Sequence, residues 1–455
     1  MDGCPAVYGT ALKEALTTRD WCMNSSERID RKVVLIDGCR IPFMRSQGMY
    51  DSLTAYDLGR MVIKALLDRT GITPELIDRV ILGNVITSMA ATNVARESAL
   101  AAGVPASVPA FTVTLACVSS NVAITTGAEL IRSGKARVII AGGTESMSDI
   151  PIGYRRRFRK KLLESRKYKG IRNYISFFRG VRLKDLLPEI PSIAEFSTGR
   201  IMGEDCDRLA ARMKISREAQ DEYAVRSHAA AAKARARGDF ADEIEPVMIP
   251  PDFIAMGEDD GIRDDTSLEN LRRLAPVFDR KYGTVTAGNA SFLTDGASAV
   301  MLMSDDTAHA FGFIPKASVT AYAYTAQDPE EDLLLGPAFA VPAVLDQADL
   351  MLDDIDVFEF HEAFAAQVLA NVQCLDSDRF AQARLGRSDK IGTIPLDKLN
   401  TAGGSLSLGH PFAATGSRLL ITASNRLARE DGTFALIASC AGGGIGNAIL
   451  LERLN

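Results

Sequence analysis

The segment NTAGGSLSLGHPFAATGSRLLITASNRL (400–427) joins a glycine-rich turn to a helix-forming stretch, and TFALIASCAGGG (433–444) follows as a strand that ends in glycines. IDVFEF (355–360) precedes them as another apolar strand, with His361 directly after it and a helix expected over 363–372. Strands that alternate with helices in this way are typical of an α/β sheet covered by helices. We therefore expect the C-terminal part of the chain to be an α/β unit.

The first part of the chain has the same order of elements. Helix-forming stretches separate four strand-like runs: VVLIDGCRIPF (33–43), VILGNVI (80–86), FTVTLAC (111–117) and ARVIIAGG (136–143). VTLAC with its following helix matches SLGHP with its following helix, and AGGTESM matches CAGGGIG. This match predicts two similar βαβ-type halves, with the alternative that any two α/β segments look alike. In a duplicated fold, the equivalent turns of both halves would meet near the junction.

Four regions follow from these patterns. We expect an N-terminal extension over 1–30, an N-terminal half over 31–150 completed by 280–305, an inserted loop domain over 151–279 and a C-terminal half over 306–455. The insertion opens with a basic amphipathic stretch, because residues 155–184 hold thirteen Lys or Arg and one acidic residue, Glu164. Such a stretch is typical of a surface that docks on an anionic membrane or a partner subunit, and a solvated basic face is the plainer interpretation.

Composition limits the class of protein. The 455 residues are 47% hydrophobic and 24% charged, with a formal net charge of −6, which is typical of a globular protein and gives no reason to expect nucleic acid as a partner. No apolar run reaches the roughly 18 residues of a membrane span, and the first 30 residues do not look like a secretion signal. Seven cysteines without a C-x-x-C pair argue against disulfides and zinc and favour a reducing, cytoplasmic location.

Cys117 is the first candidate catalytic residue. It stands where a strand meets a helix, so the helix dipole and free backbone N–H groups should stabilise its thiolate and lower its pKa. Small neighbours such as Ala116, Ser119 and Ser120 would let a substrate approach. Taken alone, such a cysteine is more often a small buried apolar residue than a nucleophile.

Three further residues stand in comparable turns. His410 lies in G-H-P before a helix, where a histidine can deprotonate a thiol or hold an oxyanion. His361 follows a strand, and Cys440 ends a strand before three glycines (442–444). Glycines there let backbone N–H groups face a ligand, as an oxyanion hole requires. Each residue alone also fits a structural role as a helix cap, a core histidine or part of a tight turn.

Together these segments resemble the thiolase family over nearly the whole chain from about residue 31. The ordered motifs are A-C-x-S-S (116–120), H-E-A-F (361–364), G-G-S-x-x-x-G-H-P-x-x-A-T-G (403–416) and C-A-G-G-G-x-G (440–446). YGTVTAGNASFLTDGA (282–297) adds a fifth segment. Within the family, H-E-A-F and the basic insertion look closest to the β subunits of fatty-acid-oxidation trifunctional complexes. The implied fold is α/β, a thiolase fold of two packed halves with an inserted loop domain.

The resemblance implies a role for each matching residue. Cys117 would take up the acyl group, His410 would activate Cys117, and Cys440 would move a proton at the α-carbon. His361 would stand where the family usually orders a catalytic water. The backbone N–H groups of Cys117 and Gly442 would form an oxyanion hole.

Ligands and partners are implied in the same way. Coenzyme A would be a co-substrate beside acyl-CoA, in a tunnel lined by Ser291 and Phe364, with no permanently bound cofactor and no metal. The chain would form a homodimer or homotetramer. An α subunit of a β-oxidation complex and a membrane surface contacted through 155–184 are further partner candidates.

The implied activity is that of a 3-ketoacyl-CoA thiolase (acetyl-CoA C-acyltransferase), which cleaves 3-ketoacyl-CoA with CoA to acetyl-CoA and a shortened acyl-CoA in fatty acid β-oxidation. A biosynthetic acetoacetyl-CoA thiolase shares every catalytic residue and stays open, as does a subunit for assembly or membrane docking. A metal hydrolase is a poorer fit because no H-E-x-x-H occurs, and a ketoacyl synthase would lack the second reactive cysteine, Cys440.

Overall fold

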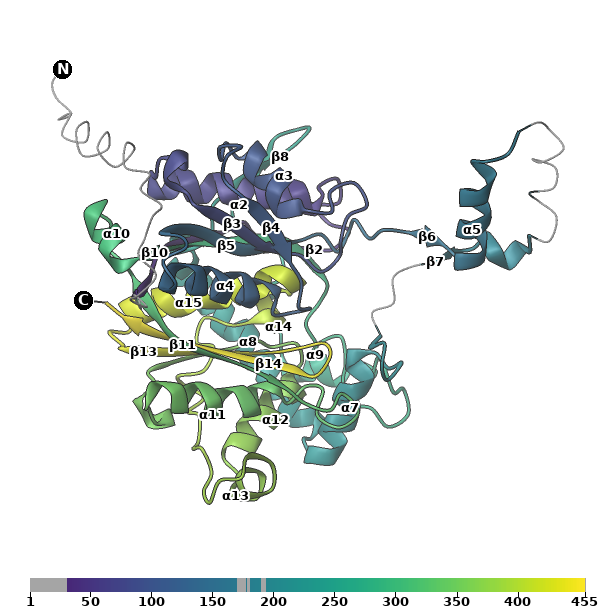
Figure 1. Ribbon diagram of the computed structural model, residues 1–455. Coiled ribbons are helices and arrows are strands. Elements are labelled where there is room, and N and C mark those ends of the chain that lie inside the picture. Colours follow the sequence, from purple (N-terminus) through teal and green to yellow (C-terminus); the bar gives the residue numbers. More distant parts are fainter. Residues whose placement is uncertain (1–30, 170–176, 178–180, 190–193, 455) are drawn as a thin grey trace.

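The computed structural model describes residues 31–169, 177, 181–189 and 194–454, so the extension expected over 1–30 lies outside the described residues. The elements stack in five layers (Figure 1). Helices form the two outer layers and the middle layer, and strands fill the layers between them. The helices of the three layers are, in turn, α2 (Ala55–Thr70) and α3 (Val94–Ala101); α4 (Ser119–Arg132) and α15 (Thr415–Arg429); and α11 (Gly336–Ala348) and α12 (Ala365–Leu375).

The strand order is symmetric about the centre of the sheet. It runs β12-β13-β14-β11-β1-β10-β5-β3-β4, with β2 (Met44–Arg45) paired to β10. The N-terminal strands are β1 (Val33–Arg40), β3 (Arg79–Gly83), β4 (Ala110–Val113), β5 (Val138–Glu145) and β10 (Thr294–Ser304). The C-terminal strands are β11 (Ala317–Ala326), β12 (Val357–Phe360), β13 (Phe434–Ala441) and β14 (Ile445–Arg453). Outward from the centre, each half places its first strand, its last strand and then mutually parallel strands, which are β13 and β12 in the C-terminal half and β5, β3 and β4 in the N-terminal half.

The two halves meet at a short main-chain seam. β1 and β11 are antiparallel and pair at two positions only, Val34 with Ser318 and Leu35 with Ala317. Side chains hold the seam instead, because one continuous apolar cluster includes residues of β1, β10, β11, β14, α4 and α15. The middle helices therefore belong to both halves of the core.

Helices α4 and α15 come close enough that a side chain is excluded between them. A Cβ placed on Gly416 would overlap Asn121 Oδ1. Ser417 N donates to Ser120 Oγ at 3.0 Å, which joins the first turns of the two helices. This contact holds the N-terminal ends of both middle helices side by side.

The strand expected to reach Cys117 ends earlier, at Val113. A tight turn follows, in which Ala116 has a φ of 45°. Ser119 Oγ accepts from Leu115 N at 2.8 Å and donates to Ala116 O at 2.7 Å, so a side chain replaces the strand's main-chain partners. The helix begins at Ser119, within two residues of Cys117.

The inserted region has an arm and a part that packs on the body. The arm is a two-stranded stalk of β6 (Gly153–Tyr154) and β7 (Pro188–Glu189) that carries α5 (Arg156–Ser165), and it projects from the body in Figure 1. Part of the expected basic stretch, 170–176 and 178–180, lies outside the described residues. No helix among the described residues is long and apolar enough to cross a membrane. The region boundaries expected from the sequence stay predictions.

The remaining elements after the arm lie on both halves. β8 (Val247–Ile249), β9 (Ile254–Met256) and α10 (Asp305–Ala310) pack on the N-terminal half. The elements on the C-terminal half are α7 (Met202–Met213), α8 (Arg217–Arg237), α9 (Leu268–Arg272), α13 (Asp378–Phe380) and α14 (Ser405–Leu408). Tyr223 and Ser227 of α8 both donate to the Glu362 carboxylate, at 3.0 and 2.8 Å. Asn400 Nδ2 and Leu406 N donate to the same group, at 2.7 and 3.2 Å. Glu362 thus ties the inserted helices to the segment around His361.

Candidate active site

Cys117 lies in the turn before α4, with part of its surface open to solvent. Burial raises the pKa of its thiol to about 12, and the Glu145 carboxylate adds to the rise. The backbone N–H groups of Cys117 and Gly442 act in the opposite direction and lower it. The expectation of a lowered pKa is therefore wrong, because loss of hydration outweighs the N–H groups and helix start that stabilise the thiolate. Cys117 is a neutral thiol at neutral pH.

His410 is held by residues at the start of α15. Its main-chain N donates to Thr294 Oγ1 at 3.0 Å, and its Nδ1 lies 2.6 Å from Thr415 Oγ1. The Thr415 hydroxyl already donates its single proton to Pro411 O at 3.1 Å, so it accepts from His410 Nδ1–H. His410 Nε2 is then the unprotonated nitrogen, and it has no hydrogen-bond partner among the described residues. That free lone pair is what a general base needs.

His361 follows β12 and lies against His410. Its main-chain N donates to Ala438 O at 2.8 Å, and its Nδ1 lies 3.0 Å from Ser405 Oγ. The two imidazole centroids are 4.1 Å apart. Burial lowers the pKa of both histidines, with Arg418 as a further cause, and the pKa of His410 falls to about 3. Both rings are therefore neutral at physiological pH.

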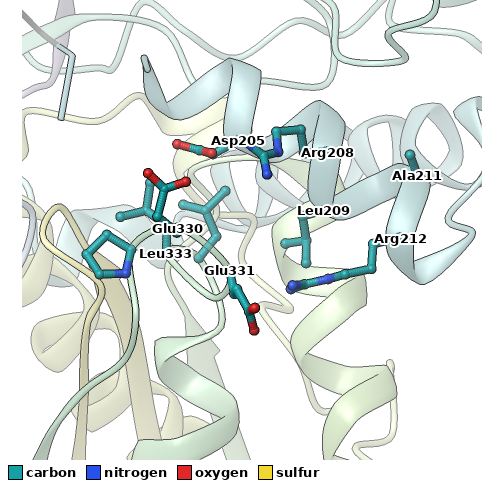
Figure 2. A pocket seen from close by; sticks show the side chains of 10 residues that line it. Asp205, Arg208, Leu209, Ala211, Arg212, Glu330, Glu331 and Leu333 are labelled. Carbon is teal, nitrogen blue, oxygen red and sulfur yellow. The ribbon is translucent and has the colours of Figure 1, made fainter. Parts of the chain in front are cut away.

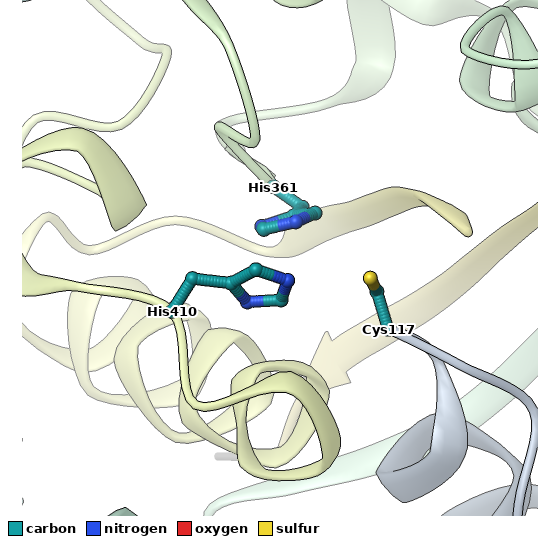
Figure 3. Close-up of side chains that lie close together, drawn as sticks. All are labelled: Cys117, His361 and His410. Carbon is teal, nitrogen blue, oxygen red and sulfur yellow. The ribbon is translucent and has the colours of Figure 1, made fainter. Parts of the chain in front are cut away.

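The two histidines converge on Cys117, as Figure 3 shows, with the sulfur facing the edges of both rings. One nitrogen of each ring and the sulfur lie within 4.8 Å of one another. His361 directly follows β12, His410 lies in the turn before α15 and Cys117 lies in the turn before α4, so the two halves meet here as expected.

Cys440 completes the group of reactive side chains. It lies near the end of β13, paired with Gly446 of β14, and it is 2% exposed. Burial raises its pKa well above the ordinary thiol value, and the nearby Cys117 adds to the rise. A buried neutral thiol can donate a proton to carbon, which suits a group that protonates a departing carbanion. Gly442, two residues later, turns its N–H toward Cys117.

Ser291 and Phe364, expected to line a tunnel, lie on neighbouring segments. Ser291 N donates to Ala363 O at 2.9 Å, and Ala290 forms a bridge with Phe364. Phe364 is 8% exposed and its ring packs edge-on against Phe278 at 6.3 Å between centroids. The structure thus places both residues near His361, on the segment that follows it and on the segment paired with that one. Their contact with coenzyme A stays a prediction.

Two carboxylates near the site, Glu145 and Glu195, were not predicted as site residues from the sequence. Glu145 accepts hydrogen bonds from Val85 N, Ile86 N and Ala413 N at 2.9–3.1 Å, so it joins turns of both halves, close enough to Cys117 to raise the pKa of its thiol. Burial raises the pKa of Glu145 to about 7. Glu195, from the segment after the arm, accepts from Gly443 N at 2.9 Å. Glu195 was hidden because a single acid in a loop has no periodic pattern.

A cavity of about 480 Å³ lies elsewhere, between α7 and the loop before α11 (Figure 2). Charged groups of both signs line it, among them Asp205, Arg208, Arg212, Glu330 and Glu331. Salt bridges such as Arg200–Glu330 at 2.9 Å and Arg212–Asp332 at 3.0 Å pair much of that charge. None of the four reactive side chains borders it, so we assign it no part in the chemistry.

Comparisons with known proteins agree with this geometry. The chain matches the thiolase N-terminal domain over residues 33–306 and the thiolase C-terminal domain over 313–453. It is 50% identical to the mitochondrial trifunctional enzyme subunit beta of Bos taurus, over 93% of this chain and 88% of that one. It is 49% identical to a probable 3-ketoacyl-CoA thiolase of Caenorhabditis elegans, over 92% and 94% of the two chains. A crystal structure of human mitochondrial 3-ketoacyl-CoA thiolase in complex with CoA superposes with a TM-score of 0.80 at 33% identity, covering 94% of this chain and 99% of that one.

Proposed function

The chain belongs to the thiolase family and has its fold, and on that basis we propose that it is a degradative 3-ketoacyl-CoA thiolase. In this reaction a 3-ketoacyl-CoA and CoA give acetyl-CoA and an acyl-CoA two carbons shorter. The observation that carries the proposal is the convergence of Cys117, His410 and Cys440 from both halves, in a chain that is 50% identical to a trifunctional enzyme β subunit. Coenzyme A is the co-substrate, and we expect no permanently bound cofactor or metal.

The geometry supports a two-step reaction. His410 Nε2 takes the proton of the Cys117 thiol, and the sulfur attacks the keto carbon of the substrate. The bond between the α- and β-carbons then breaks, which leaves an acyl thioester on Cys117 and the enolate of acetyl-CoA. Cys440 gives its proton to the α-carbon of that enolate. Its raised pKa supports this role, because a thiolate could not donate.

The second step returns the enzyme to its starting state. The thiol of a CoA molecule attacks the acyl group on Cys117 while His410 accepts the thiol proton, and the shortened acyl-CoA leaves. His410 then gives this second proton to the departing Cys117 sulfur. The first proton, which His410 took from Cys117, passes to the Cys440 thiolate before CoA attacks, so His410 is neutral again when the CoA thiol arrives. Two oxygens become negative in turn. The N–H groups of Cys117 and Gly442 face the Cys117 sulfur, and we expect them to hold one of these oxygens.

The test is thiolysis of 3-ketoacyl-CoA substrates of increasing chain length, with intact mass used to detect the acyl-enzyme. We expect wild-type protein to cleave substrates longer than acetoacetyl-CoA and Cys117→Ala to form no acyl-enzyme. Cys374→Ala, which changes a buried free cysteine of α12, is the matched control and should keep its activity. Reaction with acetoacetyl-CoA alone would favour the biosynthetic thiolase, and normal turnover by Cys117→Ala would contradict both.

We further propose a partner subunit and a reducing compartment. Identity to proteins named as β subunits supports an α subunit as the partner, and a self-associated dimer or tetramer stays part of the proposal. Five described cysteines are free thiols, which fits a reducing location. The cytoplasmic location expected from the sequence stays a prediction. The β-subunit relatives are named as mitochondrial, which points to a different compartment.

The arm supports docking on an anionic membrane as a second function. Its basic helix stands clear of the body in Figure 1, and apolar side chains are exposed beside the charges: Leu163 is 60% exposed, Leu183 86% and Leu187 55%. Exposed leucines among basic residues are typical of a surface that enters the headgroup region of a bilayer.

Removing the arm tests this docking. Tyr154 pairs with Pro188 at the top of the stalk, so Asn-Gly can replace residues 155–187 as a two-residue hairpin turn. We expect the wild-type chain to sediment with phosphatidylserine vesicles at low salt and to be released at high salt. The excised variant should stay in the supernatant and keep its thiolysis rate. Equal sedimentation of both proteins, or none by the wild type, would contradict docking through the arm.

A further inference from the structure

A buried serine, Ser405, determines which ring nitrogen of His361 carries the proton. Its Nδ1 lies 3.0 Å from Ser405 Oγ, and Ser405 is fully buried at the start of α14. The same oxygen accepts from Arg418 Nη2 at 3.3 Å. A hydroxyl has one proton to give, and among the described residues the acceptor for it is His361 Nδ1. The neutral ring of His361 then carries its proton on Nε2.

Arg418 is placed so that it can only donate to Ser405. It is fully buried on α15, its nearest carboxylate is Glu359 at 3.6 Å, and Glu359 is also paired with Arg426 at 2.8 Å. Guanidinium groups have no acceptor atom, so Arg418 occupies a lone pair of Ser405 and leaves the serine proton to face His361. The buried positive charge also disfavours a second proton on the ring.

We propose that Ser405 and Arg418 are positioning residues that fix His361 as the Nε2–H tautomer, opposite to His410. Arg418 lies three residues after Thr415, which sets the tautomer of His410. The first turns of α15 therefore set both rings, one directly and the other through Ser405. The site then offers one imidazole that accepts a proton, His410, and one that donates a hydrogen bond, His361.

Opposite tautomers suit a reaction in which one oxygen becomes negative beside the base. His361 Nε2 is buried and has no hydrogen-bond partner among the described residues, so its N–H is free for a substrate oxygen or a bound water. If both rings carried the proton on Nδ1, two lone pairs would face the developing charge. The kinetic part of this inference rests on the proposed thiolase activity, whereas the tautomers can be measured without it.

Nitrogen-15 NMR of histidine-labelled protein reads the tautomers directly. The chain has four histidines, and His228→Gln and His309→Gln assign the two that lie outside the site. In the wild type we expect His361 to be protonated on Nε2 and His410 on Nδ1. Ser405→Ala should shift His361 to a mixture of tautomers, and Arg418→Met should shift it in the same direction. Ser405→Thr keeps a hydroxyl and should restore the wild-type pattern.

Kinetics and a matched control complete the test. Loss of a donor to an oxyanion costs about 10²–10³ in rate, so the Nδ1–H form of His361 should contribute almost no turnover. The kcat of Ser405→Ala should then fall in proportion to the remaining Nε2–H fraction, about twofold for an equal mixture, with KM nearly unchanged. Ser424→Ala is the control, since Ser424 is a buried serine of α15 that bonds only to its own helix, at Ile421 O. Unchanged His361 nitrogen shifts in Ser405→Ala would overturn the proposal, whatever the activity. If the tautomers shift as expected in Ser405→Ala but the wild-type chain shows no thiolysis, only the proposed function is overturned.

Discussion

The reactive cysteine and histidine start as neutral groups, which separates this site from those that hold a thiolate–imidazolium pair. Burial raises the pKa of Cys117 to about 12 and lowers that of His410 to about 3. Between these values the thiol keeps its proton and the imidazole has none. In the proposed reaction the proton therefore moves from Cys117 to His410 as the sulfur attacks.

The neutral Cys117 thiol and the neutral His410 ring predict how the alkylation rate of Cys117 depends on pH. Only the thiolate reacts with iodoacetamide, and below its pKa the thiolate fraction rises tenfold for each pH unit. The alkylation rate of Cys117 should therefore rise steadily from about pH 6 to 9, with no plateau, because both pKa values lie outside that window. Peptide mass spectrometry measures the labelling, with Cys117→Ala as the blank. A rate that stays level between about pH 5 and 8 would instead indicate an ion pair.

The structure brings together the residues that the sequence predicted, whereas the sequence did not predict their protonation states. Cys117 and His410 stand in turns and Cys440 near the end of β13, and the small residues and glycines beside them are visible in the sequence. The direction of the Cys117 pKa was wrong, since burial depends on how the two halves close over the sulfur. Thr415 and Ser405, which hold the histidine tautomers, belong to the motif at 403–416, but the sequence does not tell which ring each hydroxyl contacts.

Among the elements, the contact between the first turns of α4 and α15 sets the distance between the two half-sites. Gly416 faces Asn121 without room for a Cβ, and Ser417 N bonds to Ser120 Oγ. Cys117 and His410 each stand a few residues before these turns. A change in the spacing of the helices would therefore move the sulfur away from the imidazole.

Gly416→Ala should show this dependence. The added Cβ overlaps Asn121, and overpacking of this kind costs about 1–3 kcal/mol, which outweighs the gain of about 1 kcal/mol from alanine in a helix. We expect lower stability in urea and a fall in kcat/KM. Gly127→Ala is the control in α4, where the nearest atom to the new Cβ is the flexible Ile139 Cγ2 at 3.2 Å. If both variants keep wild-type stability and activity, the contact does not set the spacing.

The order of elements was predictable, whereas their ends were less so. Periodicity and glycines marked the strands and helices around Cys117 and Cys440. The strand before Cys117 ends four residues early because Ser119 replaces its main-chain partners, and hydrogen bonds of this kind have no signature in hydrophobic periodicity.

For the whole molecule, the matching segments predicted two similar halves, and the sheet has a symmetric strand order. The thiolase fold that the motifs implied is confirmed by the domain matches and the superposed relative. The arm was visible only as a run of basic residues, because charge pattern does not tell whether a segment lies on the body or projects from it. Its stalk has only two residue pairs, too short to be recognised in a sequence.

The close approach of Gly416 and Asn121 also has a consequence for how the chain can change over time. The two positions belong to opposite halves, yet neither can take a larger side chain unless the other becomes smaller. Most positions of the two halves are free to diverge separately, as their different lengths and loops show. Positions 121 and 416 should therefore covary, so a homologue with a bulkier residue at one of them should have a smaller residue at the other.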